Sequence, residues 1–208
     1  ALATIGTGSD FGDLSAAKRR TDGIDNSIRG IVAGGLAPGN TNVIESVEIA
    51  TTGNATDFGD LTSARHHAVG VDSSHGGIDF DEIQRPSVTY MPGSGRVLTN
   101  GGNSPYGGTI EVFNLSTKGN ASDFGDSAGG ATRAYCGATS NMTRALFMGG
   151  DTPAKTNLVD AIEFASLGNS FDFGNLTAAK GTSQGLASTT RAVNAGGVDP
   201  SAYFNVIE

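Results

Sequence analysis

One short motif occurs four times in this 208-residue chain, and it constrains the fold more than any other feature. The motif is Asp-Phe-Gly followed by Asp or Asn, and its copies begin at Asp10, Asp57, Asp123 and Asp172. Successive copies are 47, 66 and 49 residues apart. A catalytic motif is needed only once, so four copies indicate an architecture built from repeated units.

Three further markers recur in the same order within each unit. A pair of glycines follows an Arg by five positions, and an Ile-Glu dipeptide comes after the pair. The Arg residues are Arg29, Arg96, Arg144 and Arg191, and the marker acids are Glu45, Glu111, Glu163 and Glu208. The coincidence of four ordered markers in four units predicts four copies of one supersecondary structure.

Each unit reads as four short strands separated by Gly, Asn and Pro, which favour turns. The 32 glycines and only 16% charged residues are typical of a turn-rich all-β protein. A four-stranded unit of about 50 residues is typical of a propeller blade. We therefore predict one four-bladed β-propeller domain over residues 1–208. Its blades span approximately 14–60, 61–126 and 127–175, and 176–208 plus 1–13.

The ends of the chain indicate how the ring closes. The distances from each marker Glu to the next motif Asp are 12, 12 and 9 residues, and passing from Glu208 through Ala1 to Asp10 gives 10. The N- and C-terminal strands are therefore expected to share one blade and close the ring. The chain begins with Ala rather than Met, as expected of a processed or excised polypeptide.

The order of glycine pair, apolar strand, aromatic residue and basic residue resembles that of kelch repeats, over essentially the whole chain. Kelch blades usually carry Trp where this chain has Phe11, Phe58, Phe124 and Phe173, and kelch rings usually have more blades. The DFGDLT-type variant also looks like repeat proteins of marine phages. That likeness implies a domain of a virion tail or fibre, at the virion surface or otherwise extracellular.

The repeated residues have structural interpretations. The four Phe residues are expected to fill the wedges between blades, and the motif Asp residues are expected to accept backbone N–H bonds in tight turns. Calcium binding is the alternative for these acids, although two carboxylates a site are few for six to eight ligands. The four Arg residues are expected to pair with acids of the repeat, because an unpaired buried guanidinium is costly. Lining an anion-binding channel is the alternative for them.

The symmetry fails most clearly in the second unit, which is 19 residues longer than the first. The extra material lies within residues 73–91, with His66 and His67 shortly upstream. Its acidic, basic and aromatic groups suit a sugar, and an elongated loop on a rigid scaffold is a common recognition site. The candidate ligand-binding residues are His75, Asp79, Phe80, Asp81, Arg85 and Tyr90. The alternative is a solvated insertion that covers a blade edge.

Composition narrows the function further. The net charge of −8 disfavours binding to nucleic acid, and no apolar run is long enough for a membrane span. Cys136 is the single cysteine, so it cannot form an internal disulfide, and we expect it to be buried. No catalytic grouping, metal site or cofactor motif is recognisable. We therefore expect a soluble, non-catalytic binding or attachment module that recognises a cell-surface glycan or receptor. The alternative is a structural domain that packs against neighbouring virion proteins or subunits.

Overall fold

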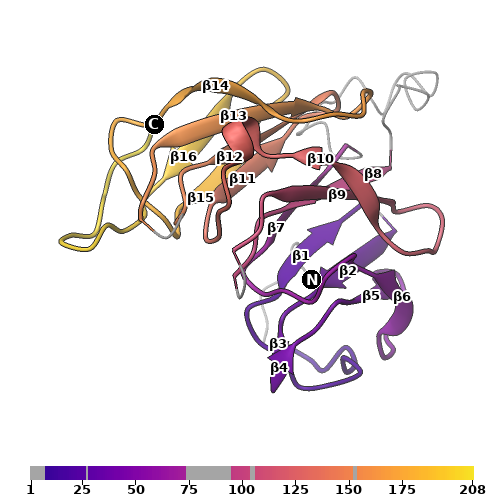
Figure 1. Ribbon diagram of the computed structural model, residues 1–208. Coiled ribbons are helices and arrows are strands. Elements are labelled where there is room, and N and C mark those ends of the chain that lie inside the picture. The colour runs from indigo at the N-terminus through magenta and orange to yellow at the C-terminus, as the bar shows by residue number, and fades with distance from the viewer. Residues whose placement is uncertain (1–7, 27, 74–94, 104–105, 152–153) are drawn as a thin grey trace.

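The protein is described by a computed structural model over residues 8–26, 28–73, 95–103, 106–151 and 154–208. The described chain consists of antiparallel β-strands and turns, with a short 3-10 segment at Ala128–Gly130. The prediction of an all-β fold is therefore confirmed. Figure 1 shows the sheets following one another in chain order, from indigo through magenta and orange to yellow.

Three sheets have four strands each, arranged side by side in chain order. The first contains β1 (Asp22–Asp25), β2 (Arg29–Ala33), β5 (Val43–Glu48) and β6 (Thr56–Asp60). The second contains β7 (Val69–Asp72), β8 (Arg96–Asn100), β9 (Thr109–Asn114) and β10 (Ser122–Asp126). The third contains β11 (Gly137–Ser140), β12 (Arg144–Met148), β13 (Leu158–Glu163) and β14 (Phe171–Asn175).

The fourth unit is smaller. It contains β15 (Gln184–Ala187) and β16 (Ala192–Ala195), which pair antiparallel. Asn194 and Glu208 exchange two backbone hydrogen bonds of 2.8 and 2.9 Å, so the end of the chain begins a third strand beside β16. A small ribbon of β3 (Leu36–Ala37) and β4 (Gly39–Asn40) lies in the first unit.

The repeated motif forms a β-bulge in the outer strand of each complete sheet. In the first sheet Glu45 pairs with Asp57 and Ile44 with Gly59, so Phe58 is the extra residue between them. The other two sheets have the same register shift. A bulge re-aims the side chain of its extra residue. Phe58 and Phe124 are accordingly 3% and 4% exposed, although the Asp that directly precedes each of them is exposed.

The glycine pairs allow each unit to approach the next one closely. Gly34 and Gly35 have φ of 60° and 114°, a region that other residues adopt at a cost. Gly35 N–H donates to the carbonyl of Arg65 at 2.9 Å, and a Cβ on Gly34 would collide with that carbonyl. The pairs of the second and third units bind the carbonyls of Arg133 and Lys180 in the same way.

The first strands of all four units line one central space. Two adjoining cavities of 340 and 270 Å³ lie there, and residues of β1, β7, β11 and β15 line both of them. The strands carry small residues where they approach one another, namely Gly23, Gly70, Ala138 and Gly185. A larger side chain at Gly70 would overlap Ile24 of the neighbouring strand. A Cβ on Gly185 would likewise collide with the Ala138 carbonyl, so the close approach of these first strands requires glycine at positions 70 and 185.

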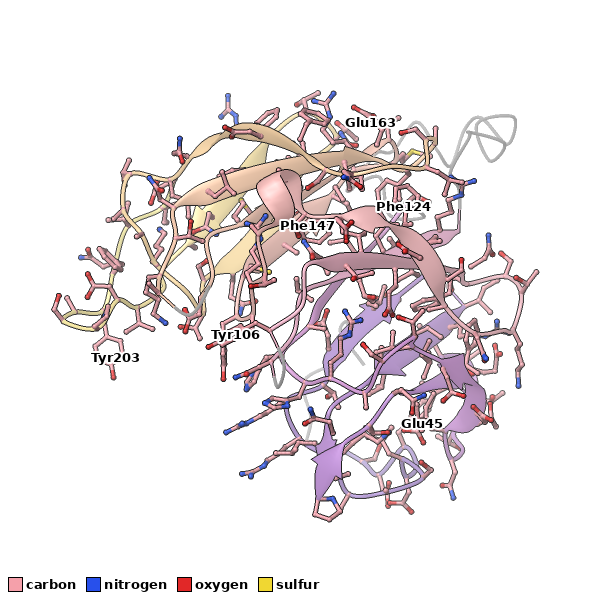
Figure 2. All side chains as sticks on the ribbon, viewed as in Figure 1. Glu45, Tyr106, Phe124, Phe147, Glu163 and Tyr203 are labelled. Carbon is pink, nitrogen blue, oxygen red and sulfur yellow. The ribbon has the colours of Figure 1, made fainter. Side chains whose placement is uncertain are left out.

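The apolar core lies between neighbouring sheets. One buried cluster joins the first two sheets and includes Phe58, Phe113 and Leu115, and Phe58 meets Phe113 edge-on with centroids 5.8 Å apart. A second cluster joins the second and third sheets and includes Phe124 and Phe147, both labelled in Figure 2. This placement of Phe58 and Phe124 agrees with the expected wedges between units.

Strand register corrects the alignment of the third unit. The acid equivalent to Glu45 and Glu111 is Asp160, because Asp160 pairs with Asp172 as Glu45 pairs with Asp57. Glu163 lies three residues further on, opposite Arg144. The corrected spacing from acid to motif Asp is 12 residues in all three complete units, two more than the 10 counted through the chain ends.

The two segments expected to complete the fourth sheet lie apart in the structure. Backbone hydrogen bonds of 2.8 Å join Gly53 N–H to Phe11 and Ala55 N–H to Asp13, so the first motif packs on the first sheet. The same contacts join the motif of each of the first two sheets to the sheet that follows. Within the described residues, no pairing joins 8–13 to 205–208, so the expected pairing of the terminal strands is not present here.

Candidate functional site at the central cavity

Four residues at one end of the central space share an unusual backbone conformation. Arg20, His67, Tyr135 and Thr182 have φ between 54° and 60°, and all four occupy the same position of the repeat. The other positive-φ residues of the described chain are all glycines. Left-handed backbone costs a side-chain-bearing residue about 1 kcal/mol or more relative to glycine, and such strain gathers at functional sites. These four, here called the rim residues, therefore define the candidate site.

Backbone hydrogen bonds connect the rim residues in sequence around the centre. His67 N–H donates to Arg20 O at 3.2 Å, Tyr135 N–H to His67 O at 3.4 Å, and Thr182 N–H to Tyr135 O at 2.7 Å. Among the described residues the fourth link, from Arg20 N–H to Thr182 O, is not formed. The rim thus has three of the four links of a closed ring.

The larger central cavity opens beside the rim and has a polar lining. His67, Tyr135 and Thr182 line its 340 Å³, together with residues 21–23 and 183–184. The volume lies within the range of about 300–1,000 Å³ typical of ligand pockets. The four side chains of the rim differ from one another, so the symmetry of the scaffold is lost at the cavity.

Aromatic and basic groups form a row across three units at the rim. The His67 and Tyr135 rings stack with centroids 4.0 Å apart and planes 35° from parallel. His66 lies 5.1 Å from His67 between ring centroids, and its Nε2 is 3.4 Å from an Arg20 nitrogen. Asn103 donates to the Tyr135 hydroxyl at 3.1 Å and so holds that ring in place.

The cavity perturbs the ionisation of two groups that line it. Burial raises the pKa of Asp22 to about 6, partly offset by hydrogen bonds from the backbone N–H groups of Gly70 and Gly23. Burial, followed by the charges of His66 and Arg20, lowers the pKa of His67 to about 4. At neutral pH the His67 imidazole is therefore neutral, and the Asp22 carboxyl is closer to protonation than an ordinary Asp. Arg20 directly precedes the lining residue Thr21, and its guanidinium approaches His66.

A buried or nearly buried ion pair recurs in every unit. In each one a basic residue, on the segment that leads from the preceding motif to the first strand, binds the third-strand acid of the same unit. The pairs are Lys18–Glu45, Arg65–Glu111, Arg133–Asp160 and Lys180–Glu208. Burial alone would raise the pKa of Glu45, but hydrogen bonds from Lys18 and Ser15 lower it below its ordinary value. The pair is thus a structural feature that all four units share.

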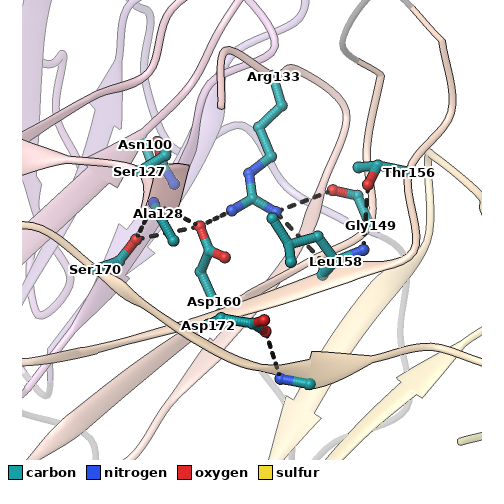
Figure 3. A network of polar contacts seen from close by, with 11 residues as sticks. Asn100, Ser127, Ala128, Arg133, Gly149, Thr156, Leu158, Asp160, Ser170 and Asp172 are labelled. Carbon is teal, nitrogen blue, oxygen red and sulfur yellow. Dashed lines mark hydrogen bonds and ion pairs between the residues drawn. The ribbon is translucent and has the colours of Figure 1, made fainter. Parts of the chain in front are cut away.

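Figure 3 shows the most enclosed of these pairs, Arg133 with Asp160. Arg133 also donates to the carbonyls of Gly149 and Leu158, both at 3.4 Å. Asp160 accepts from the Ser170 hydroxyl at 3.1 Å. Sequence reasoning noted these basic residues but did not pair them with the acids, although their fourfold recurrence at positions 18, 65, 133 and 180 was a visible signal.

The Arg series that the sequence did single out has a different place. Arg29 binds Glu48 at 2.9 Å and Arg144 binds Glu163 at 2.6 Å, both in partly exposed positions. Arg96 faces Asn114 and donates to the Phe164 carbonyl, and Arg191 is exposed. The expectation that each of these Arg residues pairs with an acid of the repeat therefore holds for Arg29 and Arg144 only, and both pairs are partly exposed. Among the described residues Arg96 and Arg191 form no ion pair, and Asn114 lies opposite Arg96 where the other two complete sheets have an acid. None of the four lines the central cavities.

The Asp and Phe residues of the repeated motif differ in their surroundings from one unit to another. Asp10 and Asp172 accept a hydrogen bond from the backbone N–H two residues on, at 3.0 Å each, as expected for a tight turn. Phe11 and Phe173 are 40% and 53% exposed, unlike their buried counterparts. The ligand-binding candidates His75, Asp79, Phe80, Asp81, Arg85 and Tyr90 lie outside the described residues.

Cys136 is buried, as expected, and burial raises its pKa to about 11. In the part of the chain that the structure describes, no three His, Cys, Asp or Glu side chains are grouped closely enough to hold a metal ion. That part also contains no helix with the length and apolarity needed to cross a membrane. No protein-family model matches the chain, and no curated protein matches it either.

Proposed function

We propose that the four units are the blades of a four-bladed β-propeller with kelch-like blades. Three complete sheets of one topology, four equivalent ion pairs and a shared central space support this architecture. In the closed ring, residues 9–13 would form the outer strand of the fourth blade beside the strand that ends at Glu208. A shared blade of this kind fastens a ring, because opening it must break a sheet.

An open groove of 490 Å³ supports this closure. It lies between the third sheet and β15–β16, and its lining includes Phe173, Gly174 and Glu208. A Cβ on Gly174 would meet no atom within 4 Å. The equivalent Gly12, Gly59 and Gly125 each pack against the glycine carbonyl of a following unit. We attribute to the same missing segment the exposure of four apolar side chains around the groove, Phe171, Phe173, Val206 and Ile207. Residues 1–13 of the same chain supply the repeat segment that the groove lacks.

As a molecular function we propose a non-catalytic binding or attachment module that recognises a cell-surface glycan or receptor through the central cavity. The observation that carries this function is the rim, where four different side chains replace glycine at a strained position. A scaffold alone needs equal residues at such a position, whereas a binding site needs different ones. Support for a place on a phage tail or fibre comes from the sequence resemblance.

A glycan array tests this function with three forms of the full chain. The wild type is compared with His67→Ala/Tyr135→Ala and with a variant in which a short Gly-Ser turn replaces residues 74–90. We expect the wild type and the loop variant to bind the same glycans and the double variant to bind none, with all three showing the same circular dichroism. Loss of binding in the loop variant alone would place the site in the insertion instead. Absence of binding by the wild type would contradict glycan recognition.

A structural interaction domain is the second candidate, and the exposed apolar side chains of the open groove favour it. If neighbouring subunits cover Phe171, Phe173 and Ile207, the isolated chain should associate at micromolar concentration. Light scattering of the wild type and of Phe173→Ser would then show an oligomer that the substitution disperses. A monomer at all concentrations would support closure within one chain.

A further inference from the structure

Among the described residues, no carboxylate forms an ion pair with the arginines at the rim. In the described chain seven basic side chains form ion pairs, among them Lys18 next to the rim and Lys155 on the third unit. Over the same residues, Arg19 and Arg20 form none, and both are exposed. Arg20 instead approaches His66 Nε2, itself a poor partner for a cation. An uncompensated guanidinium is a ready partner for a ligand anion, above all for the planar fork of a carboxylate.

The two arginines make the field at this end of the cavity positive, although the whole chain carries a net charge of −8. After burial, the charges of Arg20 and Arg19 lower the pKa of His66, and Arg20 also lowers that of His67. A local positive region on an acidic protein favours the approach of anions to this place over the rest of the surface.

The lining of the cavity supplies a different chemistry. Asp22 lines the cavity, and Thr21, Thr182 and Gln184 add two hydroxyls and an amide, all on exposed residues. A carboxyl whose pKa is raised by burial accepts hydrogen bonds from hydroxyl groups but repels a second carboxylate. The His67–Tyr135 pair adds aromatic surface to this polar interior. A matching ligand therefore has its anionic group at one end and hydroxyl donors at the other.

We propose, on the basis of the binding function above, that the ligand is an acidic sugar residue. Its carboxylate binds Arg20 at the rim, its ring contacts the His67–Tyr135 pair, and its hydroxyls donate to Asp22 and contact Thr182 or Gln184. A neutral sugar leaves Arg20 unpaired, and a simple inorganic anion leaves the polar interior unused. The cavity thus selects for both features in one molecule.

The test compares glucuronic acid and N-acetylneuraminic acid with glucose and inorganic phosphate as probes of the full chain. Binding is followed by NMR shifts of the His66 and His67 side chains and by calorimetry. We expect an acidic sugar to bind at least tenfold more tightly than glucose or phosphate, and the bound carboxylate to raise the pKa of His67. Arg20→Gln should lose at least tenfold in affinity, whereas Arg20→Lys should retain part of it. Arg191→Gln, which removes another exposed Arg without an acid partner in the described chain, should bind as the wild type does.

Four other outcomes would each contradict a stated part of the proposal. Equal binding of glucose and both acids would overturn the acidic ligand but leave glycan recognition standing. Phosphate binding as tight as that of the sugar acids would show that Arg20 holds a simple anion only. If none of the sugars moves the histidine signals and the glycan array is also blank, both proposals fail. An unchanged affinity of Arg20→Gln for the acidic sugar would place the carboxylate elsewhere.

Discussion

Arg133 and Arg144 have the same charge and each binds an acid, but their surroundings differ. The side chains of Arg133 and Asp160 are both 0% exposed, whereas those of Arg144 and Glu163 are 43% and 39% exposed. Water screens the second pair and leaves each partner solvated when the other is removed. A buried acid that loses its partner keeps the full cost of desolvation.

Substitution of these two arginines should therefore have unequal effects on stability. Arg133→Met should lower the free energy of unfolding by about 3–5 kcal/mol, because Asp160 is left buried and unpaired. The matched change Arg144→Met should cost less than about 1 kcal/mol. Urea unfolding followed by circular dichroism measures both. Similar losses for the two variants would show that the enclosed pair stabilises the fold no more than the exposed pair does.

Asp22 should make stability depend on pH in the acidic range. Its folded pKa of about 6 exceeds the ordinary value of 3.8, so the folded state holds the proton more tightly. The stabilisation is complete below pH 4 and is lost as the pH rises towards 6, by at most about 3 kcal/mol. His67 acts in the opposite direction, since its lowered pKa makes stability fall as the pH drops from 6.5 to about 4.

The difference in unfolding free energy between the wild type and Asp22→Asn isolates the first effect, because His67 is common to both. We expect this difference to shift in favour of Asp22→Asn as the pH is raised from 4 to 7. Chemical unfolding at half-unit intervals of pH provides the measurement. A constant difference would mean that the Asp22 carboxyl is well solvated.

At the scale of elements, the outer strands explain why the motif combines Asp, Phe and Gly. The bulge makes Phe the extra residue, and Gly59 and Gly125 lie against the glycine carbonyl at the start of the next outer turn. A side chain at either glycine would collide with that carbonyl, and both have φ of 156°. The motif is therefore a joint between units and has no direct part in chemistry.

Substitution of the motif Phe residues distinguishes a closed from an open fourth joint. Phe58→Ala should lower the free energy of unfolding by about 3–5 kcal/mol, because a large buried ring leaves a cavity. If residues 9–13 close the fourth blade, Phe173→Ala should cost a similar amount. If the joint stays open, Phe173 is 53% exposed and its removal should cost less than about 1 kcal/mol. We expect the larger loss, measured by urea unfolding.

At the scale of the whole molecule, the chain ends decide whether the four units form a ring. Val43 pairs with Asp60 and Leu158 with Asn175 in the complete sheets. The equivalent pair in a closed fourth sheet is Val206 with Asp13. Directly opposed residues of antiparallel strands lie about 4.5–5.5 Å apart between Cα atoms, within reach of a disulfide.

Cysteines at positions 13 and 206, in a Cys136→Ala background, should therefore form a disulfide within one chain. We expect a monomer that is stabilised by about 2–4 kcal/mol relative to its reduced form. A control with cysteines at positions 13 and 203 should not close, because Tyr203 is 91% exposed on a loop beyond the pair. Mass spectrometry and non-reducing gels give the result. Disulfide-linked dimers would show that the N-terminal strand completes a neighbouring copy.

The number and order of the repeated units could be predicted from the sequence, because they depend on local patterns that every unit repeats. Phe58 and Phe124 could be predicted as wedge residues in the same way, whereas the exposure of Phe11 and Phe173 could not. The ligand candidates of the insertion stay a prediction.

The pairs of groups that meet across strands became visible only in the folded chain. Asp160, rather than Glu163, faces Arg133, and the two acids are three residues apart and so point to opposite faces of the strand. The rim could not be predicted either. Its four residues share no residue type, and none of them is glycine or asparagine. Their common conformation arises from the hydrogen bonds between units, which no local stretch of sequence contains.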